Sequence, residues 1–369
     1  MQIGIYDETD PLKTVAYWPP GLETLVAQTL PTEESLFFDK FDVQEAANEH
    51  ENLIKLLNSL GVKTINLKDQ YTKTLQETGC TINPQLIVEQ CKKNMKMYGT
   101  KIDTNLIPKL LEKDISRYGK EKAITLNYIL CVENGLPVAN IFYSRDVGSV
   151  IFDKFFMARP RYKIRKIEVP IIEKSLETLD VEPVIHLPKG IIECGDLMIH
   201  NKNILLGNGM RTNDVGTLTM LKEVEEYVQN KSYKFLIVKI PDAEFHEQMK
   251  IMHLDTFYMP VNQNTVVVCP AVAKKCEVIE LPKCKRHNFY QYLKMNGYEI
   301  IPITKKQQEA LVSNFLTIDK NTIVAPNSTN GLYKMLESYG VKTYYVNIHN
   351  LVNGYGGVHC MFLQFLRGY

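Results

Sequence analysis

The stretch SNFLTIDKNTIVAP (313–326), followed by GLYKMLESYGVKTYYVNI (331–348), contains one complete repeating unit of this chain. Two β-rich runs meet at an Asp-Lys-Asn turn, which is the residue chemistry of a tight hairpin. A helix follows, with apolar residues at helical spacing, and Gly340 stands where a left-handed residue closes such a helix. The final run is again β-rich. The unit is therefore predicted to be a ββαβ module.

The same elements recur along the chain. Paired β-runs with Asn-rich turns occupy 195–207 and 254–270, and a helix followed by a β-run occupies 51–67, 288–303 and, more loosely, 219–240. Repetition of one supersecondary unit is typical of solenoids and radial arrays. No Pro/Ser-rich linker interrupts the pattern. We therefore predict an α/β fold in which residues 1–369 form a single domain.

Each predicted hairpin begins with a polar residue, namely Asp196, Asp255 or Asn314. In a closed radial array these strand starts would converge on one axis, although ordinary strand-edge residues explain the same pattern. Residues 75–134 differ from the modules because they have helical spacing and no hairpin. We interpret 75–134 as a helical insertion within the domain.

Composition excludes several classes of protein. The 43 Lys and Arg residues balance 42 Asp and Glu residues, so nothing favours nucleic acid or an anionic membrane as a partner. No apolar run is long enough to span a membrane, and the N-terminus lacks the pattern of a secretory signal. Eight cysteines without a CxxC pair do not form a disulfide scaffold or a zinc motif. We expect a soluble, cytoplasmic protein that acts on a small molecule; homo-oligomerisation stays open.

The run GGVHC (356–360) places Cys360 after two glycines. A thiol exposed by such a loop is a candidate nucleophile, although a lone cysteine is more often a small buried residue. Other short motifs add four carboxylates and one histidine, namely Asp146, Glu193, Asp196, His253 and Asp255. An anionic pocket of this kind selects a cation, and a planar guanidinium pairs best with carboxylates. These residue types also bind metals, but their spacing matches no known ligand motif. We therefore predict no metal.

Taken in order, these motifs resemble the guanidine-modifying superfamily, and within it arginine deiminase most closely. The matching runs are LFFDKFDVQEAANEHENLIKLLNSLGVKTINL (36–67), LPVANIFYSRD (136–146), RKIE (165–168), ECGD (193–196), RTN (211–213), MHLDT (252–256) and GGVHC (356–360). The resemblance implies a five-bladed α/β propeller of ββαβ modules with a helical insertion. It also implies hydrolysis of the guanidinium group of L-arginine to citrulline and ammonia through a covalent Cys-thiouronium, without a cofactor.

The resemblance implies a role for each matching residue. Cys360 would be the nucleophile and His253 the general acid and base. Asp146 and Asp255 would hold the guanidinium nitrogens, and Glu193 would support His253 or the guanidinium. The residues implied in substrate binding are Asn140, Arg165 and Arg211, which would take the α-carboxylate, together with Asp196. Arg159 and Arg161 are rivals to Arg165, because the spacing in FMARPRYKIRK differs from the family pattern.

Two positions depart from the family pattern: Cys194 replaces a glycine, and Tyr355 stands where an arginine is usual. The second change weakens the assignment of free arginine as the substrate. An amidinotransferase that passes the amidino group to an amine, or a dihydrolase that gives ornithine, would use the same motifs. A protein that only binds cationic amino acids is the non-catalytic alternative. Retention of Cys360 with His253 argues against it, because binding alone needs only the carboxylates.

Overall fold

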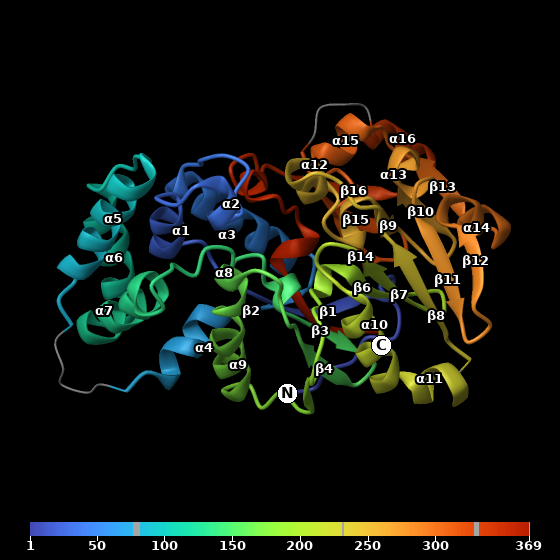
Figure 1. Ribbon diagram of the computed structural model, residues 1–369, viewed down its shortest axis with the longest axis horizontal. Coiled ribbons are helices and arrows are strands. Elements are labelled where there is room, and N and C mark those ends of the chain that lie inside the picture. The colour runs from blue at the N-terminus through green and yellow to red at the C-terminus, as the bar shows by residue number, and fades with distance from the viewer. Residues whose placement is uncertain (77–81, 231, 328–331, 369) are drawn as a thin grey trace.

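The computed structural model describes residues 1–76, 82–230, 232–327 and 332–368. Its strands form five sheets, and each sheet contains an antiparallel pair joined on one side by a parallel strand (Figure 1). An antiparallel hairpin followed by a helical crossover to a parallel strand is the ββαβ unit. The five units confirm the predicted repeat and are the blades of an α/β propeller.

Three blades follow one another in the middle of the chain. Blade one contains β3 (Gly148–Ile151), β4 (Lys154–Met157), α8 (Lys163–Lys166), α9 (Val169–Glu177) and β5 (Val184–His186). Blade two contains β6 (Leu197–His200), β7 (Asn203–Asn208), α10 (Asp214–Glu223), α11 (Glu225–Asn230) and β8 (Lys234–Lys239). Blade three contains β9 (Tyr258–Pro260), β10 (Thr265–Val268), α13 (Pro270–Ala273), α14 (Phe289–Met295) and β13 (Glu299–Pro302), and α12 (Phe245–Lys250) precedes it.

The other two blades include the ends of the chain. Blade four contains β14 (Leu316–Asp319), β15 (Thr322–Pro326), α16 (Leu332–Ser338) and β16 (Lys342–Val346), and α15 (Lys305–Glu309) precedes it. Blade five contains β17 (Leu363–Arg367), β1 (Leu12–Tyr17), α1 (Leu22–Ala27), α2 (Thr32–Ser35), α3 (Val43–Ser59) and β2 (Lys63–Asn66). Because β17 pairs antiparallel with β1, the C-terminal strand completes the N-terminal blade.

One hairpin departs from the predicted repeat. β11 (Glu277–Leu281) and β12 (Lys285–Asn288) lie within the sequence of blade three, between α13 and α14. They nevertheless extend the sheet of blade two, because β11 pairs antiparallel with β8. The side chains of β11 alternate between buried and partly exposed, as expected for a strand with one face on the core.

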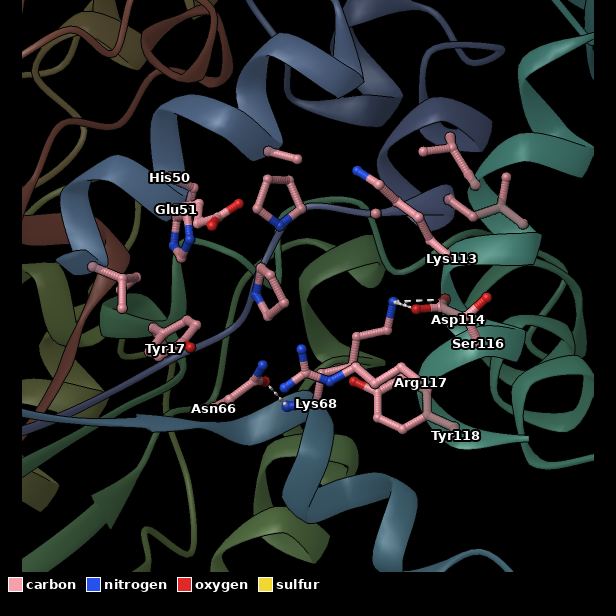
Figure 2. A pocket seen from close by; sticks show the side chains of 17 residues that line it. Tyr17, His50, Glu51, Asn66, Lys68, Lys113, Asp114, Ser116, Arg117 and Tyr118 are labelled. Atoms are coloured by element: carbon pink, nitrogen blue, oxygen red, sulfur yellow. Dashed lines mark hydrogen bonds and ion pairs between the residues drawn. The ribbon is translucent and has the colours of Figure 1, made fainter. Parts of the chain in front are cut away.

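Residues 77–81 of the predicted insertion lie outside the described residues, and helices dominate the rest of it. It contains α5 (Gln85–Tyr98), α6 (Leu106–Tyr118), α7 (Lys120–Tyr128) and a π-helical turn (Ile129–Glu133), and α4 (Leu67–Thr74) precedes it. These helices lie at one end of the molecule (Figure 1). A cavity of about 540 Å³ separates α6 from blade five (Figure 2). Among the described helices, none combines the length and the apolar character that a bilayer crossing requires.

Short 3₁₀ turns carry the candidate site residues to the centre of the fold. Such turns span Ser144–Val147, Cys194–Asp196, Leu254–Thr256 and His359–Met361, and each leads directly or within one residue into the first strand of a blade. Side-chain bonds join neighbouring turns: Asp196 accepts from the backbone of Leu254 at 3.0 Å. Asn314 in turn donates through Nδ2 to the carbonyl of Asp255 at 3.3 Å, so the hairpin starts lie close together and the convergence that the sequence left open is present.

Candidate active site

Cys360 lies in the last of these turns, and its side chain is buried. Its Sγ is 3.7 Å from Oδ2 of Asp255. Oδ1 of Asn314 accepts hydrogen bonds from the backbone N–H groups of both Gly357 and Cys360, at 3.1 and 3.2 Å. Burial, reinforced by Asp255 and Asp146, raises the pKa of the Cys360 thiol well above its ordinary value. Without a bound cation the sulfur is therefore a thiol rather than a thiolate.

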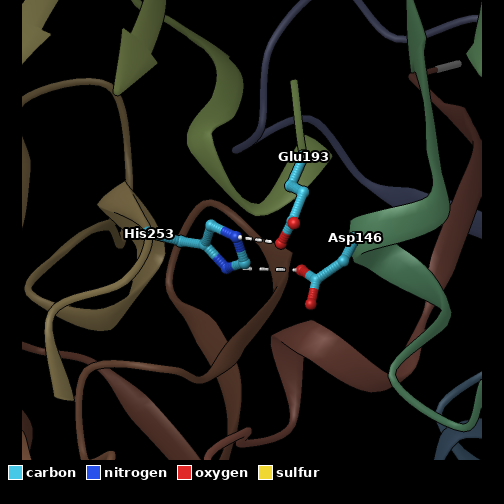
Figure 3. Close-up of side chains that lie close together, drawn as sticks. All are labelled: Asp146, Glu193 and His253. Carbon is cyan, nitrogen blue, oxygen red and sulfur yellow. Dashed lines mark hydrogen bonds and ion pairs between the residues drawn. The ribbon is translucent and has the colours of Figure 1, made fainter. Parts of the chain in front are cut away.

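His253 stands between two carboxylates on neighbouring blades (Figure 3). Its Nε2 lies 3.1 Å from Oε2 of Glu193, and its Nδ1 lies 3.4 Å from Oδ1 of Asp146. Burial by itself would lower the pKa of His253, but Asp146 and Glu193 outweigh it and raise that pKa to about 9. The histidine is consequently an imidazolium near neutral pH and can donate a proton.

The close packing of these three groups depends on Gly195. A Cβ at this position would lie 2.6 Å from Nδ1 of His253 and 2.8 Å from Oδ1 of Asp146. Any side chain here would push the imidazole and the carboxylate apart. The neighbouring Cys194, which departs from the family pattern, is buried and does not line the cavity. Burial raises the pKa of the Cys194 thiol to about 12, so it stays protonated.

A chain of buried groups extends from Asp255 to the N-terminal segment. His359 Nδ1 lies 2.7 Å from Oδ2 of Asp255, and His359 Nε2 lies 3.1 Å from Oε1 of Glu8. Burial would lower the pKa of His359, but its bonds to both acids raise it. A charged His359 in turn helps to hold the pKa of Asp255 below its ordinary value, against the effect of burial.

Sequence reasoning missed Glu8, His359 and Asn314 as parts of the site. His359 lies inside the GGVHC run, where the pattern assigns it no role, and the pattern predicts Asn314 only as a hairpin start. Glu8 lies 351 residues from His359 along the chain, and no local signal connects them. Two signals could have found the others. His359 is adjacent to the candidate nucleophile Cys360, and Asn314 begins a hairpin in the same way as Asp196 and Asp255.

Arg211 and Arg165 are both buried and both line the cavity at Cys360. Arg211 Nη1 lies 2.9 Å from Oε2 of Glu193, and its guanidinium lies 4.6 Å from the ring centroid of Tyr162. Although burial opposes the effect, Arg211 and His253 lower the pKa of Glu193 to about 2. Glu193 is therefore ionised at neutral pH.

Arg165 bonds to the backbone oxygens of Asn140 and Tyr143 and lies 3.3 Å from Oδ2 of Asp146. The two alternatives to Arg165, Arg159 and Arg161, have other partners. Arg159 bonds through Nε to the backbone of Gly190. Arg161 donates through its backbone N–H to Glu193 and through Nη1 to the carbonyl of Met210, and neither rival lines the cavity.

Asn140 and Asp196 have different positions. Asn140 lines the cavity, and its Nδ2 donates to the carbonyl of Ser35 at 2.7 Å. Asp196 does not line the cavity; it accepts from Thr212 Oγ1 at 2.6 Å and from the backbone of Leu254. This places Asp196 behind His253, where its bonds fix the turn that carries the imidazole.

The cavity between these side chains has a volume of only about 20 Å³. That volume holds about one water molecule, far less than a drug-sized or amino-acid ligand needs. Gly354, Tyr355 and Gly356 form one wall of the cavity, together with Leu36. The cavity is therefore too small for an amino-acid ligand as it stands, and lining side chains must shift before a substrate fits.

The donor atoms of Asp146, Glu193 and His253 lie within 4.8 Å of one another, so their chemistry alone would suit a metal ion. Their present partners oppose it. The two ring nitrogens of His253 face different carboxylates, and the guanidinium groups of Arg165 and Arg211 already bond to those same carboxylates. Two buried cations beside the donors raise the electrostatic cost of adding a divalent ion.

The fold and this buried Cys-His-carboxylate set define a protein of the guanidine-modifying superfamily. Within it, the chain belongs to the arginine deiminase family, whose model matches residues 131–367. An arginine deiminase of Streptococcus agalactiae is 24% identical, over 99% of this chain and 98% of that protein. A putative arginine deiminase of Mycoplasma pneumoniae is 21% identical over the same shares.

Solved structures share the fold. Dimethylarginine dimethylaminohydrolase of Pseudomonas aeruginosa, in a complex with citrulline, has a TM-score of 0.60 and 15% identity, over 96% of this chain and 99% of that one. The N-terminal domain of a cyanobacterial arginine dihydrolase has a TM-score of 0.62 and 11% identity, over 96% and 98%. At these identities the likeness concerns the fold alone, and it agrees with the five-bladed propeller.

Proposed function

We propose that this protein hydrolyses the guanidinium group of L-arginine to citrulline and ammonia through a covalent intermediate on Cys360. One observation carries the proposal: a buried thiol and a buried imidazolium line the same cavity, beside carboxylates that can hold a planar cation. Binding alone would need the carboxylates but neither the thiol nor the proton donor.

Two acceptor oxygens are available to the guanidinium nitrogens. Oδ1 of Asp255 is buried and forms no hydrogen bond with any group in the described ranges. Oδ1 of Asp146 also lacks a hydrogen bond there, although it is 3.4 Å from Nδ1 of His253 in an ion pair. An unsatisfied buried acceptor costs about 1–3 kcal/mol, which a substrate N–H would recover. A cation bound between these two acids would also lie beside Cys360 and would lower the pKa of its thiol, which is raised in the empty site.

Chemistry would then proceed in two halves. When the cation binds, the Cys360 thiol releases its proton to solvent, since His253 is already protonated. The thiolate then attacks the guanidinium carbon, and His253 gives its proton to the departing ammonia, which leaves a Cys-thiouronium. His253 next takes a proton from a water molecule that attacks the same carbon, the C–S bond breaks, and citrulline and the free thiol result. Glu193 keeps the imidazole of His253 in place through the 3.1 Å contact.

The substrate's α-carboxylate would bind to Asn140, Arg165 and Arg211, which line the cavity. Arg211 must first exchange Glu193 for the carboxylate, or share its donors between them, because it already bonds to Glu193. We propose a positioning role for Asp196, since its partners are Thr212 and the turn that follows His253.

The proposal extends to the whole chain. Residues 1–369 would act as one catalytic domain with the insertion at 75–134, in the cytoplasm, on a small guanidino compound and without a metal or cofactor. A homo-oligomer is compatible with this function, and the exposed surface does not select an oligomeric state.

The decisive experiment is to incubate the protein with L-arginine, with and without glycine as an amine acceptor, and to measure citrulline, ornithine and ammonia together. Citrulline and ammonia in equal amounts support the proposal. Ornithine with two equivalents of ammonia would indicate a dihydrolase, and ornithine formed only with the acceptor would indicate an amidinotransferase. No product, with intact arginine binding by calorimetry, would indicate a binding protein.

A further inference from the structure

The cavity of about 540 Å³ between the insertion and blade five has no part in the proposed reaction. Its volume is within the range of small-molecule sites, roughly 300–1,000 Å³. One wall is mainly apolar and aromatic, with Tyr17, Pro19, Pro20 and Ile54. The opposite wall is the C-terminal half of α6, with Lys113 and Arg117 (Figure 2). The cavity therefore has two chemically different walls, one apolar and one cationic.

Most charges in the cavity already have partners. Lys68 is buried and bonds to both oxygens of Asp114 at 2.9 and 3.1 Å. Arg117 forms a two-point pair with Asp69, at 2.8 and 2.5 Å. Glu51, which also lines the cavity, pairs with Lys55 at 2.7 Å.

Lys113 differs from these residues. Across the described ranges it forms no ion pair, although Glu51 feels its charge and has its pKa lowered in part by it. Lys113 is exposed to solvent at the rim of the cavity, so its ammonium group is hydrated and free to pair with an incoming anion.

The apolar wall contains one buried polar atom that has no partner in the part of the chain that the structure describes. His50 lines the cavity and is only 1% exposed, and its Nε2 has no hydrogen-bond partner among the described groups. Burial lowers the pKa of His50 to about 3, so the ring is neutral and offers one donor and one acceptor. Tyr17 lies beside it, at 5.3 Å between ring centroids. This wall suits a flat or apolar body with one polar atom.

We propose that this cavity is an effector site for a small organic anion, with its acidic group at Lys113 and its apolar or planar body against Tyr17, Pro19 and Pro20. The acidic group is a phosphate or a carboxylate, because an ammonium group pairs with both.

The position of the cavity connects it to the active site. His50 packs against Phe362, two residues after Cys360, with ring centroids 6.4 Å apart. Its neighbour on α3, Glu49, accepts hydrogen bonds from the backbone N–H groups of Asn350 and Leu351, at 3.0–3.1 Å. These residues lead into the turn before Tyr355, which walls the active-site cavity. A ligand against α3 would bias the position of that wall; this part of the inference rests on the proposed function.

Binding is tested by calorimetry on the whole protein, with AMP and phenylacetate as anionic probes and adenosine and phenylacetamide as their neutral counterparts. We expect at least one anion to bind about fivefold more tightly than its neutral counterpart, which is the upper range for an ion pair with an exposed lysine. Which anion binds distinguishes phosphate from carboxylate. If neither anion binds, or if the neutral compounds bind equally well, the site assignment is overturned.

Variants localise the binding. Lys113→Met should weaken binding of the preferred anion about fivefold, and Lys113→Arg should retain it. Lys109→Met, an exposed lysine on the same helix outside the cavity, is the matched control. Equal effects of the two methionine variants would overturn the assignment.

The coupling has its own readout, which is kcat/KM for arginine with and without the anion. We expect a change of at least about twofold in the wild type and none in Lys113→Met. Binding without any kinetic change would overturn the coupling. Because calorimetry needs no turnover, failure of the proposed function and failure of the binding site give different results.

Discussion

The side-chain oxygen of Asn314 lies 3.2 Å from the backbone nitrogen of Cys360 and fixes the turn that presents the thiol. Asn314→Ala should therefore reduce kcat by about 10–100-fold, because small misplacement of a reacting atom costs about that much. KM should change by less than about twofold, since Asn314 does not line the cavity. The exposed turn residue Asn321, replaced by Ala, is the control. A rise in KM with unchanged kcat would contradict the positioning role.

Cys360→Ala should abolish turnover and leave the binding of a cationic ligand largely intact, because the thiol forms the bond and the carboxylates hold the guanidinium. Arginine binding by calorimetry and citrulline formation are measured on the same sample. Cys194→Ala is the matched control, as its buried thiol lies outside the cavity. Turnover by Cys360→Ala within about tenfold of wild type, equal to about 1.4 kcal/mol of barrier, would refute the nucleophile assignment.

Arg211→Ala should reduce kcat/KM for L-arginine far more than for agmatine, which lacks the α-carboxylate. Truncating one side of a buried charge pair costs about 2–5 kcal/mol, whereas loss of a surface pair costs about 0–1. The measurement is the ratio of the two kcat/KM values in wild type and variant. If both substrates suffer alike, Arg211 acts through its 2.9 Å bond to Glu193 and does not recognise the carboxylate.

Activity should survive exhaustive dialysis against EDTA. Asp146, Glu193 and His253 could supply metal ligands, but Arg165 and Arg211 already neutralise the two carboxylates. Citrulline formation is measured before and after dialysis, and again after addition of zinc or manganese. Loss of activity that a metal restores would establish a metal-dependent reaction instead.

The stabilisation that depends on charged His253 should disappear as the pH rises. Its pKa is raised from 6.5 to about 9, so this contribution is complete below 6.5 and is lost as pH rises through 9. Each unit of pKa difference corresponds to about 1.4 kcal/mol. Urea denaturation of wild type and His253→Gln between pH 6 and pH 10 should show their difference in unfolding free energy shrinking. A constant difference would show that His253 is uncharged in the folded protein.

Much of the fold could be predicted from local pattern. The hairpin at 313–326 and the helix and strand at 331–348 each carry their own periodicity and turn residues, and the same signals recur in the other modules. The β11–β12 hairpin shows where this fails. Local sequence can specify that these residues form strands. It cannot specify that β11 pairs with β8 at the edge of blade two, because that pairing depends on the packing of the blades.

The sequence by itself determined the repeating ββαβ unit and the chemical types at the site: a cysteine, a histidine and carboxylates that begin hairpins. Tertiary structure decided which of them meet and in what charge state. The sequence offers Arg159, Arg161 and Arg165 as candidates for binding the substrate carboxylate. Only the tertiary structure shows that Arg165 is buried and lines the cavity. Likewise the Asp255–His359–Glu8 chain joins residues 351 positions apart, and pKa values follow from such surroundings rather than from residue type.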